Sequence, residues 1–340
     1  MTLLDDVLRR DIRACARLLR WIDDGLPDAR SILKQLYRHT GKAFIIGITG
    51  NPGAGKSTLT DRLIGNFRSA GKTVAVVAVD PSSPFSGGAI LGDRIRMQQH
   101  ATDDGVFIRS FATRGHLGGL TSTTGDVVHA LDAMGWDLIL VETVGVGQDE
   151  VEVQRLAQTT MVVMAPGMGD EIQAIKAGIL EIADIFVVNK ADREGAGRTV
   201  NELKMMLNMG FVPAAELQHH GPAAVAADSK QPRVTPGDWV PLIVKTIATT
   251  GEGLDEVVVA IAEHRKAYER AAADPEFVRS RLRQEFIDIY RRTLFTHGWS
   301  YLMHEDRLNQ VIDRLVDHSS DPYSLAEQTV TALGHGKTAP

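Results

Sequence analysis

The chain has 340 residues, 44% of them hydrophobic and 24% charged, and its 37 basic and 43 acidic side chains leave a formal charge of −6. This length fits about two domains, and the mildly acidic balance argues against nucleic-acid binding, which needs a basic face. The single cysteine, Cys15, excludes an intrachain disulfide and favours a reducing, cytoplasmic setting, and no apolar run reaches the roughly 18 residues that suggest a membrane span.

The first forty residues have the pattern of helices. Apolar side chains recur at roughly helical spacing over residues 3–20, and Pro27 begins a second helix that includes Leu36 and is closed by Gly41. Charges fall throughout the N-terminus, so an amphipathic helix explains it better than a secretory signal does. We therefore predict an N-terminal helical segment over residues 1–41.

From Ala43 onward, short apolar runs alternate with helical stretches. The runs lie at 43–48, 74–79, 106–111, 137–142, 161–165, 185–189 and 241–246. Runs that are apolar on both faces are typical of strands buried between helix layers, and alternation of strand and helix favours a mostly parallel sheet. We predict a doubly wound α/β domain over residues 42–265, with a loop or a short helical insertion at 211–240.

The chain becomes helical and highly charged after Leu254. Pro275 divides this region, with a helix expected from about Glu276 to Phe295 and shorter ones at 305–318 and 323–333. One stripe of the helix after Pro275 is apolar and needs a cover, from the same chain or from a second subunit; its members are Phe277, Leu282, Phe286, Tyr290 and Leu294. Residues 266–340 are therefore predicted to form a C-terminal helical region, and the pattern itself leaves open which of the two covers the stripe.

A phosphate-binding loop lies between the first predicted strand and the helix after it. The eight residues match G-x-x-x-x-G-K-[ST]; they are Gly50, Asn51, Pro52, Gly53, Ala54, Gly55, Lys56 and Ser57, with Thr58 next in the helix. Glycines let backbone N–H groups surround phosphate oxygens, the lysine supplies a point charge, and the serine hydroxyl can ligate Mg²⁺. The fold class is therefore predicted to be that of a P-loop NTPase.

A second motif distinguishes the two purines. Asn189, Lys190 and Asp192 follow an apolar run and belong at the carboxyl end of a strand, where ligands gather in open sheets. The Asp192 carboxylate can accept hydrogen bonds from the guanine N1–H and 2-amino group, a donor pair that adenine lacks. Backbone N–H groups near Thr246 and Ala248, after the last strand, are candidates to reach the guanine 6-oxo group. These residues predict binding of GTP and GDP.

Carboxylates near the phosphates are candidate Mg²⁺ ligands, either directly or through water. Asp80 and Glu142 end predicted strands, and Asp93 lies between strands. Asp80 could instead cap a helix, and Asp93 could form a surface ion pair. Glu142 occupies the place where many GTPases carry the Asp of Asp-x-x-Gly, and the N–H of Gly145 would then contact the γ-phosphate.

The motifs resemble those of the MeaB/ArgK family of P-loop GTPases over nearly the whole chain. The stretches that carry the resemblance are GNPGAGKST, DPSSPFSGGAILGDRIRM, RGHLGGL, ETVGVGQ, PGMGDEIQAIKAGI and NKAD, in this order. The resemblance implies a homodimeric GTPase that acts as a chaperone of adenosylcobalamin-dependent methylmalonyl-CoA mutase or a related acyl-CoA mutase, in cofactor loading, protection and reactivation. It also implies that Pro166–Lys176 relays the nucleotide state to the mutase.

Some catalytic roles stay open at this stage. Gln148 could orient the attacking water or could simply be a polar residue at a helix N-terminus, and Arg114 could approach the phosphates or contact the partner. Lys56, Asp80, Asp93 and Glu142 are the other candidate catalytic residues, because GTP hydrolysis rests mainly on positioning and charge neutralisation. We expect slow intrinsic hydrolysis that the mutase accelerates.

Other functions share the phosphate loop. An ATP-dependent kinase, the activity for which ArgK was formerly named, is disfavoured by the NKAD motif. A nickel-insertion GTPase would need soft or imidazole ligands, whereas the histidines are scattered. A protein-targeting GTPase would need a Met-rich domain, whereas the methionines are dispersed. A scaffold that uses GTP only as a conformational ligand stays an alternative.

Overall fold

The computed structural model describes residues 2–80, 98–100, 102–112, 121–143, 145, 149–167, 182–210 and 239–335. Contacts divide the chain into two units, Met1–Phe277 and Val278–Pro340, which are described separately. The described residues contain no helix that is both long and apolar enough to cross a membrane. Most of the expected insertion at 211–240 lies outside them.

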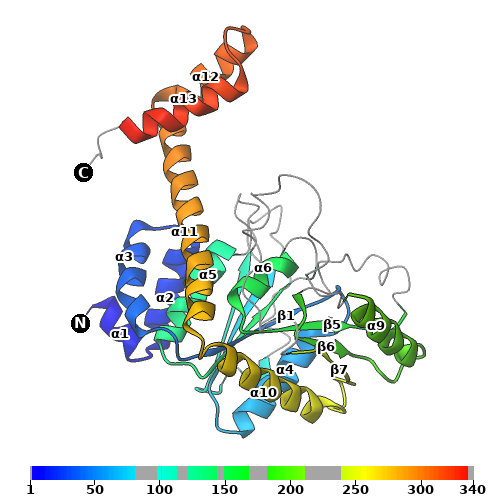
Figure 1. Cartoon of the computed structure of the whole chain (residues 1–340). Helices are drawn as coiled ribbons and strands as arrows, with labels where there is room; N and C mark the ends of the chain where they lie inside the picture. Colours follow the sequence, from blue (N-terminus) through cyan, green and yellow to red (C-terminus); the bar gives the residue numbers. More distant parts are fainter. Residues whose placement is uncertain are drawn as a thin grey trace. The chain divides into compact units, whose positions relative to one another are not determined.

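A seven-stranded parallel sheet forms the centre of the first unit (Figure 1). The strand order is β3-β2-β4-β1-β5-β6-β7, and all seven predicted strands are present. Their bounds are β1 Phe44–Thr49, β2 Val74–Asp80, β3 Val106–Ala112, β4 Leu138–Glu142, β5 Thr159–Met164, β6 Ile185–Val188 and β7 Leu242–Lys245. Because the chain moves to one side of β1 first and to the other side later, the carboxyl end of β1 is the switch point where such sheets bind ligands.

Helices cover both faces of this sheet, because alternate residues of the buried strands face opposite helix layers. On one face, α4 (Lys56–Ser69) and α10 (Leu254–Ala271) bury Leu63 and Ile261 against strand residues such as Ile46. On the opposite face lie α5 (Thr121–Ala133), α6 (Asp149–Leu156) and α9 (Ala196–Gly210). The α/β fold predicted from the sequence is confirmed, and the sheet is parallel throughout.

Three N-terminal helices form a further layer over α5 (Figure 1). They are α1 (Leu3–Leu8), α2 (Ile12–Asp23) and α3 (Pro27–Leu36), followed by the 3₁₀ turn Tyr37–His39. The continuous helix expected over residues 3–20 is wrong: Arg10 has φ 66°, and the Asp11 carboxylate caps a new helix by accepting from the Ala14 N–H at 2.7 Å. The layer buries Leu18 and Leu19 in the core that includes Leu131 of α5.

Asp132 of α5 connects this helical layer to the sheet. Its buried carboxylate accepts hydrogen bonds from the backbone N–H groups of Gly41, Lys42 and Ala43, at 2.5, 2.9 and 2.8 Å. These three residues lead from the last N-terminal helix into β1. A carboxylate that satisfies three consecutive backbone donors therefore fixes where the first strand begins, directly before the phosphate loop.

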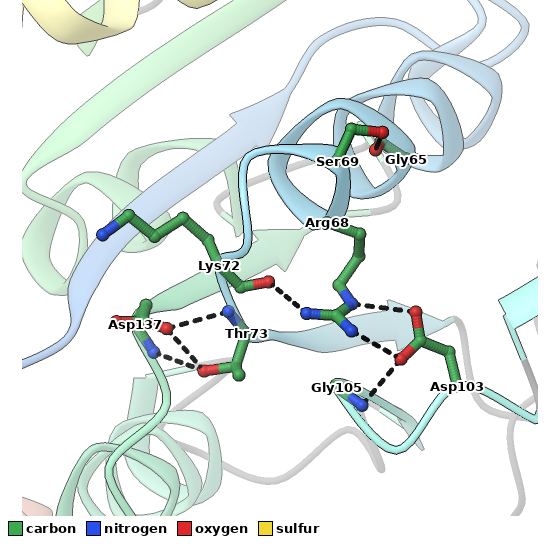
Figure 2. Close-up of polar contacts among 8 residues, drawn as sticks. All are labelled: Gly65, Arg68, Ser69, Lys72, Thr73, Asp103, Gly105 and Asp137. Atoms are coloured by element: carbon green, nitrogen blue, oxygen red, sulfur yellow. Dashed lines mark hydrogen bonds and ion pairs between the residues drawn. The ribbon is translucent and has the colours of Figure 1, made fainter.

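Polar contacts brace the amino edge of the sheet, opposite the phosphate loop (Figure 2). Arg68, in the last turn of α4, forms a two-point pair with Asp103, with both N···O distances at 2.8 Å. The Asp137 carboxylate, just before β4, accepts from the Thr73 N–H and hydroxyl, both at 2.8 Å. These bonds, led by the one from the Thr73 N–H, hold the pKa of Asp137 below its ordinary value.

The second unit is helical. α11 (Pro275–Met303) begins in the first unit and continues through the second, followed by the 3₁₀ turn His304–Asp306, α12 (Arg307–Val316) and α13 (Pro322–His335). α11 extends beyond the predicted end at Phe295, and a Cβ at Gly298 would lie 3.4 Å from Leu333 of α13, in ordinary contact.

Replacing Asp137 with asparagine should lower the free energy of unfolding by about 1 kcal/mol at neutral pH, because the amide is a weaker acceptor for the two Thr73 donors. Since the pKa of Asp137 lies below 3.8, its contribution is present above about pH 4 and is lost as the pH falls through that lowered pKa. Urea unfolding measured from about pH 7 to about pH 3 should show that the difference in unfolding free energy between wild type and variant becomes smaller as the pH falls. Asp313→Asn, at an exposed position on α12, is the control, and a gap independent of pH would contradict this account.

Candidate functional site

The phosphate loop lies between β1 and α4 and depends on glycine. Gly50, Gly53 and Gly55 have φ values of 127°, 77° and 97°, which residues with a side chain rarely adopt. A Cβ on Gly50 would overlap the backbone of Val163, and one on Gly55 would overlap the side chain of Asn189. The loop is therefore packed against the ends of the neighbouring strands, and α4 begins directly after it.

Lys56, the first residue of α4, is held across this loop. Its Nζ donates to the carbonyls of Gly50 and Asn51 at 2.6 and 3.1 Å, and the side chain is 7% exposed. Burial of a positive charge is tolerable only with oxygen partners. The ammonium group is therefore positioned beside the backbone that would enclose a phosphate, as the motif predicts.

Glu142 lies beside the same loop because β4 pairs with β1, in a register that sets Ile48 opposite Glu142. The Ser57 hydroxyl donates to Glu142 Oε1 at 2.6 Å, and the Thr60 hydroxyl lies 2.7 Å from Glu142 Oε2. The carboxylate is 5% exposed. Thr60 was not among the predicted site residues, although its position three residues after Ser57 places both hydroxyls on one face of α4.

Oxygen atoms of Ser57 and Glu142 suit Mg²⁺, which prefers hard oxygen ligands and usually keeps several waters. The described ranges contain no group of three or more His, Cys, Asp or Glu side chains able to hold a metal ion. The side chain of Asp80 and the whole of Asp93 lie outside the described residues, so their metal roles stay predictions.

Gly145 approaches the phosphate loop from the carboxyl end of β4. It is buried, has φ 86°, and a Cβ there would overlap the Gly50 carbonyl and lie 2.7 Å from Lys56 Nζ. Its backbone therefore lies next to the lysine expected to contact the outer phosphates. Gln148 and Arg114 lie outside the described residues.

Asn189 joins the phosphate loop to the turn after β7. Its Nδ2 donates to the Ala54 carbonyl at 2.8 Å, while its Oδ1 accepts from the Ala248 N–H at 3.0 Å and from the Thr246 hydroxyl at 3.2 Å. The side chain is 2% exposed. The turn that contains Thr246 and Ala248 therefore lies beside the NKAD motif, as expected from the sequence.

The other three NKAD residues lie at the rim of the same site. Lys190 has φ 56°, and its Nζ donates to the Gly53 carbonyl at 2.6 Å. The Ala191 N–H donates to the Thr246 carbonyl at 3.0 Å, and this bond connects the NKAD segment to the first residue after β7. Asp192 is exposed, so its carboxylate is accessible to a purine edge. The loop thus has the components of a base-recognition site next to the phosphate loop.

The family model described as methylmalonyl Co-A mutase-associated GTPase MeaB matches residues 15–301. The chain belongs to the MeaB family. A Pyrococcus abyssi protein named as a GTPase is 44% identical to this MeaB family member over 335 residues, covering 97% of each chain. The mouse protein named methylmalonic aciduria type A homolog, mitochondrial, is 36% identical over 226 residues, which are 66% of this chain and 50% of that protein.

The fold of this MeaB family member also matches a solved structure. The crystal structure of a LAO/AO transport system kinase has a TM-score of 0.64 and 22% identity, over 98% of this chain and 96% of that chain. At that identity the match supports the fold alone. The family match confirms the family predicted from the motifs, and the structural match confirms the P-loop fold. Relatives named as GTPases agree with a guanine-nucleotide site.

Gly145→Ala should weaken binding of a non-hydrolysable GTP analogue by about tenfold or more, because the new Cβ overlaps Gly50 and crowds Lys56. Titration with a fluorescent analogue measures this. Gly135→Ala is the matched control: Gly135 has a similar φ of 83°, but an added Cβ there has no atom within 4 Å. Both variants share the backbone strain, so equal losses of affinity would contradict a specific contact at Gly145.

Proposed function

We propose that this MeaB family member binds GTP with Mg²⁺, hydrolyses it, and assists an adenosylcobalamin-dependent acyl-CoA mutase of the methylmalonyl-CoA mutase type in cofactor loading, protection and reactivation. The observation that carries the nucleotide part is Asn189, which holds the phosphate loop at Ala54 and the turn at Ala248 together. The family description carries the mutase part.

In the proposed complex, backbone N–H groups of the phosphate loop surround the phosphates and Lys56 neutralises their charge. Ser57 would hold Mg²⁺, with Glu142 orienting it through the Ser57 hydroxyl or a bound water. The ion supplies charge that stabilises the transferred phosphoryl group. Asp192 accepts from the guanine N1–H and 2-amino group, and the Lys190 stem covers one face of the ring. Gln148 and Arg114 complete the proposal as candidates for positioning water and phosphate.

The mutase partner is supported by the family description and by the name of the mouse relative. Pro166–Lys176 is the proposed relay segment. A cytoplasmic location is part of the proposal, in keeping with a single buried cysteine, Cys15, whose thiol pKa burial raises to about 12. A kinase is a weaker candidate, because the NKAD motif offers the Asp192 carboxylate to a donor pair that guanine has and adenine lacks.

We also propose that the protein is a homodimer through its C-terminal helices. On α11, Phe286, Tyr290, Leu294 and Trp299 have exposed fractions of 65%, 52%, 52% and 48%. Phe286 and Tyr290 stack with ring centroids 5.9 Å apart, one helical turn from each other. Apolar side chains at helical spacing favour a covering surface, which a second copy would supply.

Asp192→Asn should lower GDP affinity by about a hundredfold, because two hydrogen bonds to a charged acceptor are lost. It should raise affinity for xanthosine diphosphate, whose 2-oxo group can accept from the new amide. Titrations with GDP, xanthosine diphosphate and ADP measure the change. Glu194→Gln, at an exposed position in the same loop, is the charge-matched control. Wild type that holds ADP as firmly as GDP would contradict guanine specificity.

Saturating methylmalonyl-CoA mutase from the same source should raise phosphate release from GTP by about tenfold or more, because the partner orders catalytic loops. Lys56→Ala, which removes the phosphate-facing charge, is the control for contaminating activity. Pull-downs of the mutase in GDP and in a GTP analogue report binding separately. Nucleotide-dependent binding with unchanged turnover would instead support the scaffold alternative.

A further inference from the structure

We propose that Arg62 of α4 is a positioning residue for guanine recognition, holding the base-recognition turn Thr246–Thr250 in the geometry that reads the 6-oxo group. The inference rests on the proposed guanine-nucleotide function and adds to it a residue outside every motif that the sequence shows. Arg62 lies six positions after Lys56 in the same helix, whereas the turn it contacts is more than 180 residues away in the chain.

Two hydrogen bonds connect Arg62 to the turn. Its Nε donates to the Ala248 carbonyl at 3.1 Å, and its Nη2 donates to the Thr249 carbonyl at 2.5 Å. A planar guanidinium that meets two consecutive carbonyls restrains direction as well as distance, which a single point donor does not. Because Asn189 Oδ1 accepts from the Ala248 N–H at 3.0 Å, both polar groups of Ala248 are held, one by the residue that follows β6 and one by α4.

The restraint on the carbonyls extends to the N–H groups of the turn. In a trans peptide the C=O and the following N–H lie in one plane and point in opposite directions. Holding the Ala248 carbonyl therefore sets the direction of the Thr249 N–H, and holding the Thr249 carbonyl sets that of Thr250. The Thr250 N–H already donates to the Ile247 carbonyl at 3.0 Å. An acceptor such as the guanine 6-oxo group would meet the Thr249 N–H, whose orientation is fixed in advance.

Arg62 also connects the two halves of the nucleotide site through one rigid element. α4 carries Lys56 and Ser57 at its first turn and Arg62 two turns later. The spacing between the phosphate-binding residues and the base-recognition turn is thereby set by helix geometry. Loops alone would leave this spacing variable, whereas a nucleotide bound in one conformation requires one distance between its phosphate and base sites.

If Arg62 only stabilised the fold, Arg62→Ala would lower the thermal stability and would not selectively alter recognition of the base. The residue is exposed, so truncating it leaves no cavity in the core. The contact between α4 and α10 rests on buried side chains such as Leu63, Val257 and Ile261, which Arg62→Ala does not alter. Thermal stability should therefore change little, whereas recognition of the base should change.

The test compares wild type with Arg62→Ala and Arg62→Lys, using GDP, 6-thio-GDP, inosine diphosphate and ADP. The thio analogue keeps the N1–H and 2-amino group but has a much weaker acceptor at position 6, and the inosine nucleotide keeps the 6-oxo group but lacks the 2-amino group. Arg62→Ala should weaken the binding of GDP by about tenfold and the binding of 6-thio-GDP by less than about threefold. The ratio of GDP to inosine diphosphate affinity, which reports the contact of Asp192 with the 2-amino group, should stay unchanged. Arg62→Lys should have affinities between those of wild type and Arg62→Ala.

Arg20→Ala, which removes an exposed arginine with one ion pair on α2, is the control and should leave all four affinities unchanged. Equal weakening of GDP and 6-thio-GDP by Arg62→Ala, or no weakening of either, would overturn the role of Arg62 while leaving guanine binding intact. Wild type with no preference for GDP over ADP would overturn the proposed function itself, and the role of Arg62 with it. Melting curves of all variants distinguish loss of recognition from loss of folding.

Discussion

The nucleotide site depends on one buried side-chain amide. Asn189 donates to the phosphate loop at Ala54 and accepts from the Ala248 N–H and the Thr246 hydroxyl. An amide is the side chain that offers a donor and an acceptor at this spacing, whereas a carboxylate would place an acceptor against the Ala54 carbonyl and leave buried oxygens unsatisfied. The approach is possible only because Gly55 has no Cβ, so the glycine and the asparagine are required together.

Much of this arrangement follows from the sequence because its causes are local. Apolar runs of strand length predicted all seven strands, and the glycine and lysine spacing predicted the phosphate loop. The break at Arg10 was missed because the apolar spacing continues across it, although Asp11 is a typical helix cap. The end of α11 was predicted at Phe295, whereas the helix continues through Gly298 to Met303.

The contacts of the site residues were harder to predict than their identities. Glu142 was predicted beside the metal, but its hydrogen bonds to Ser57 and Thr60 depend on how β4 and β1 pair. Arg62 left no sequence signal, because an exposed arginine on a helix is usually a solvated surface residue. Its role depends on where a turn from the far end of the domain folds back, and a single sequence does not contain that information in a local pattern.

Contacts at the amino edge of the sheet stabilise the fold, whereas the carboxyl edge carries the candidate nucleotide site. At the amino edge, Arg68 with Asp103 and Thr73 with Asp137 connect α4, β2, β3 and β4 through charge-assisted hydrogen bonds that need no ligand (Figure 2). At the carboxyl edge, the described loops contain glycines at positive φ, such as Gly50 and Gly145, where a Cβ would overlap the backbone of a neighbouring segment. Because α4 takes part in both edges, the brace at its last turn restrains the helix that presents Lys56 at its first. A rigid amino edge thus lets the opposite edge be built from loops that bind a ligand without loss of register in the strands beneath.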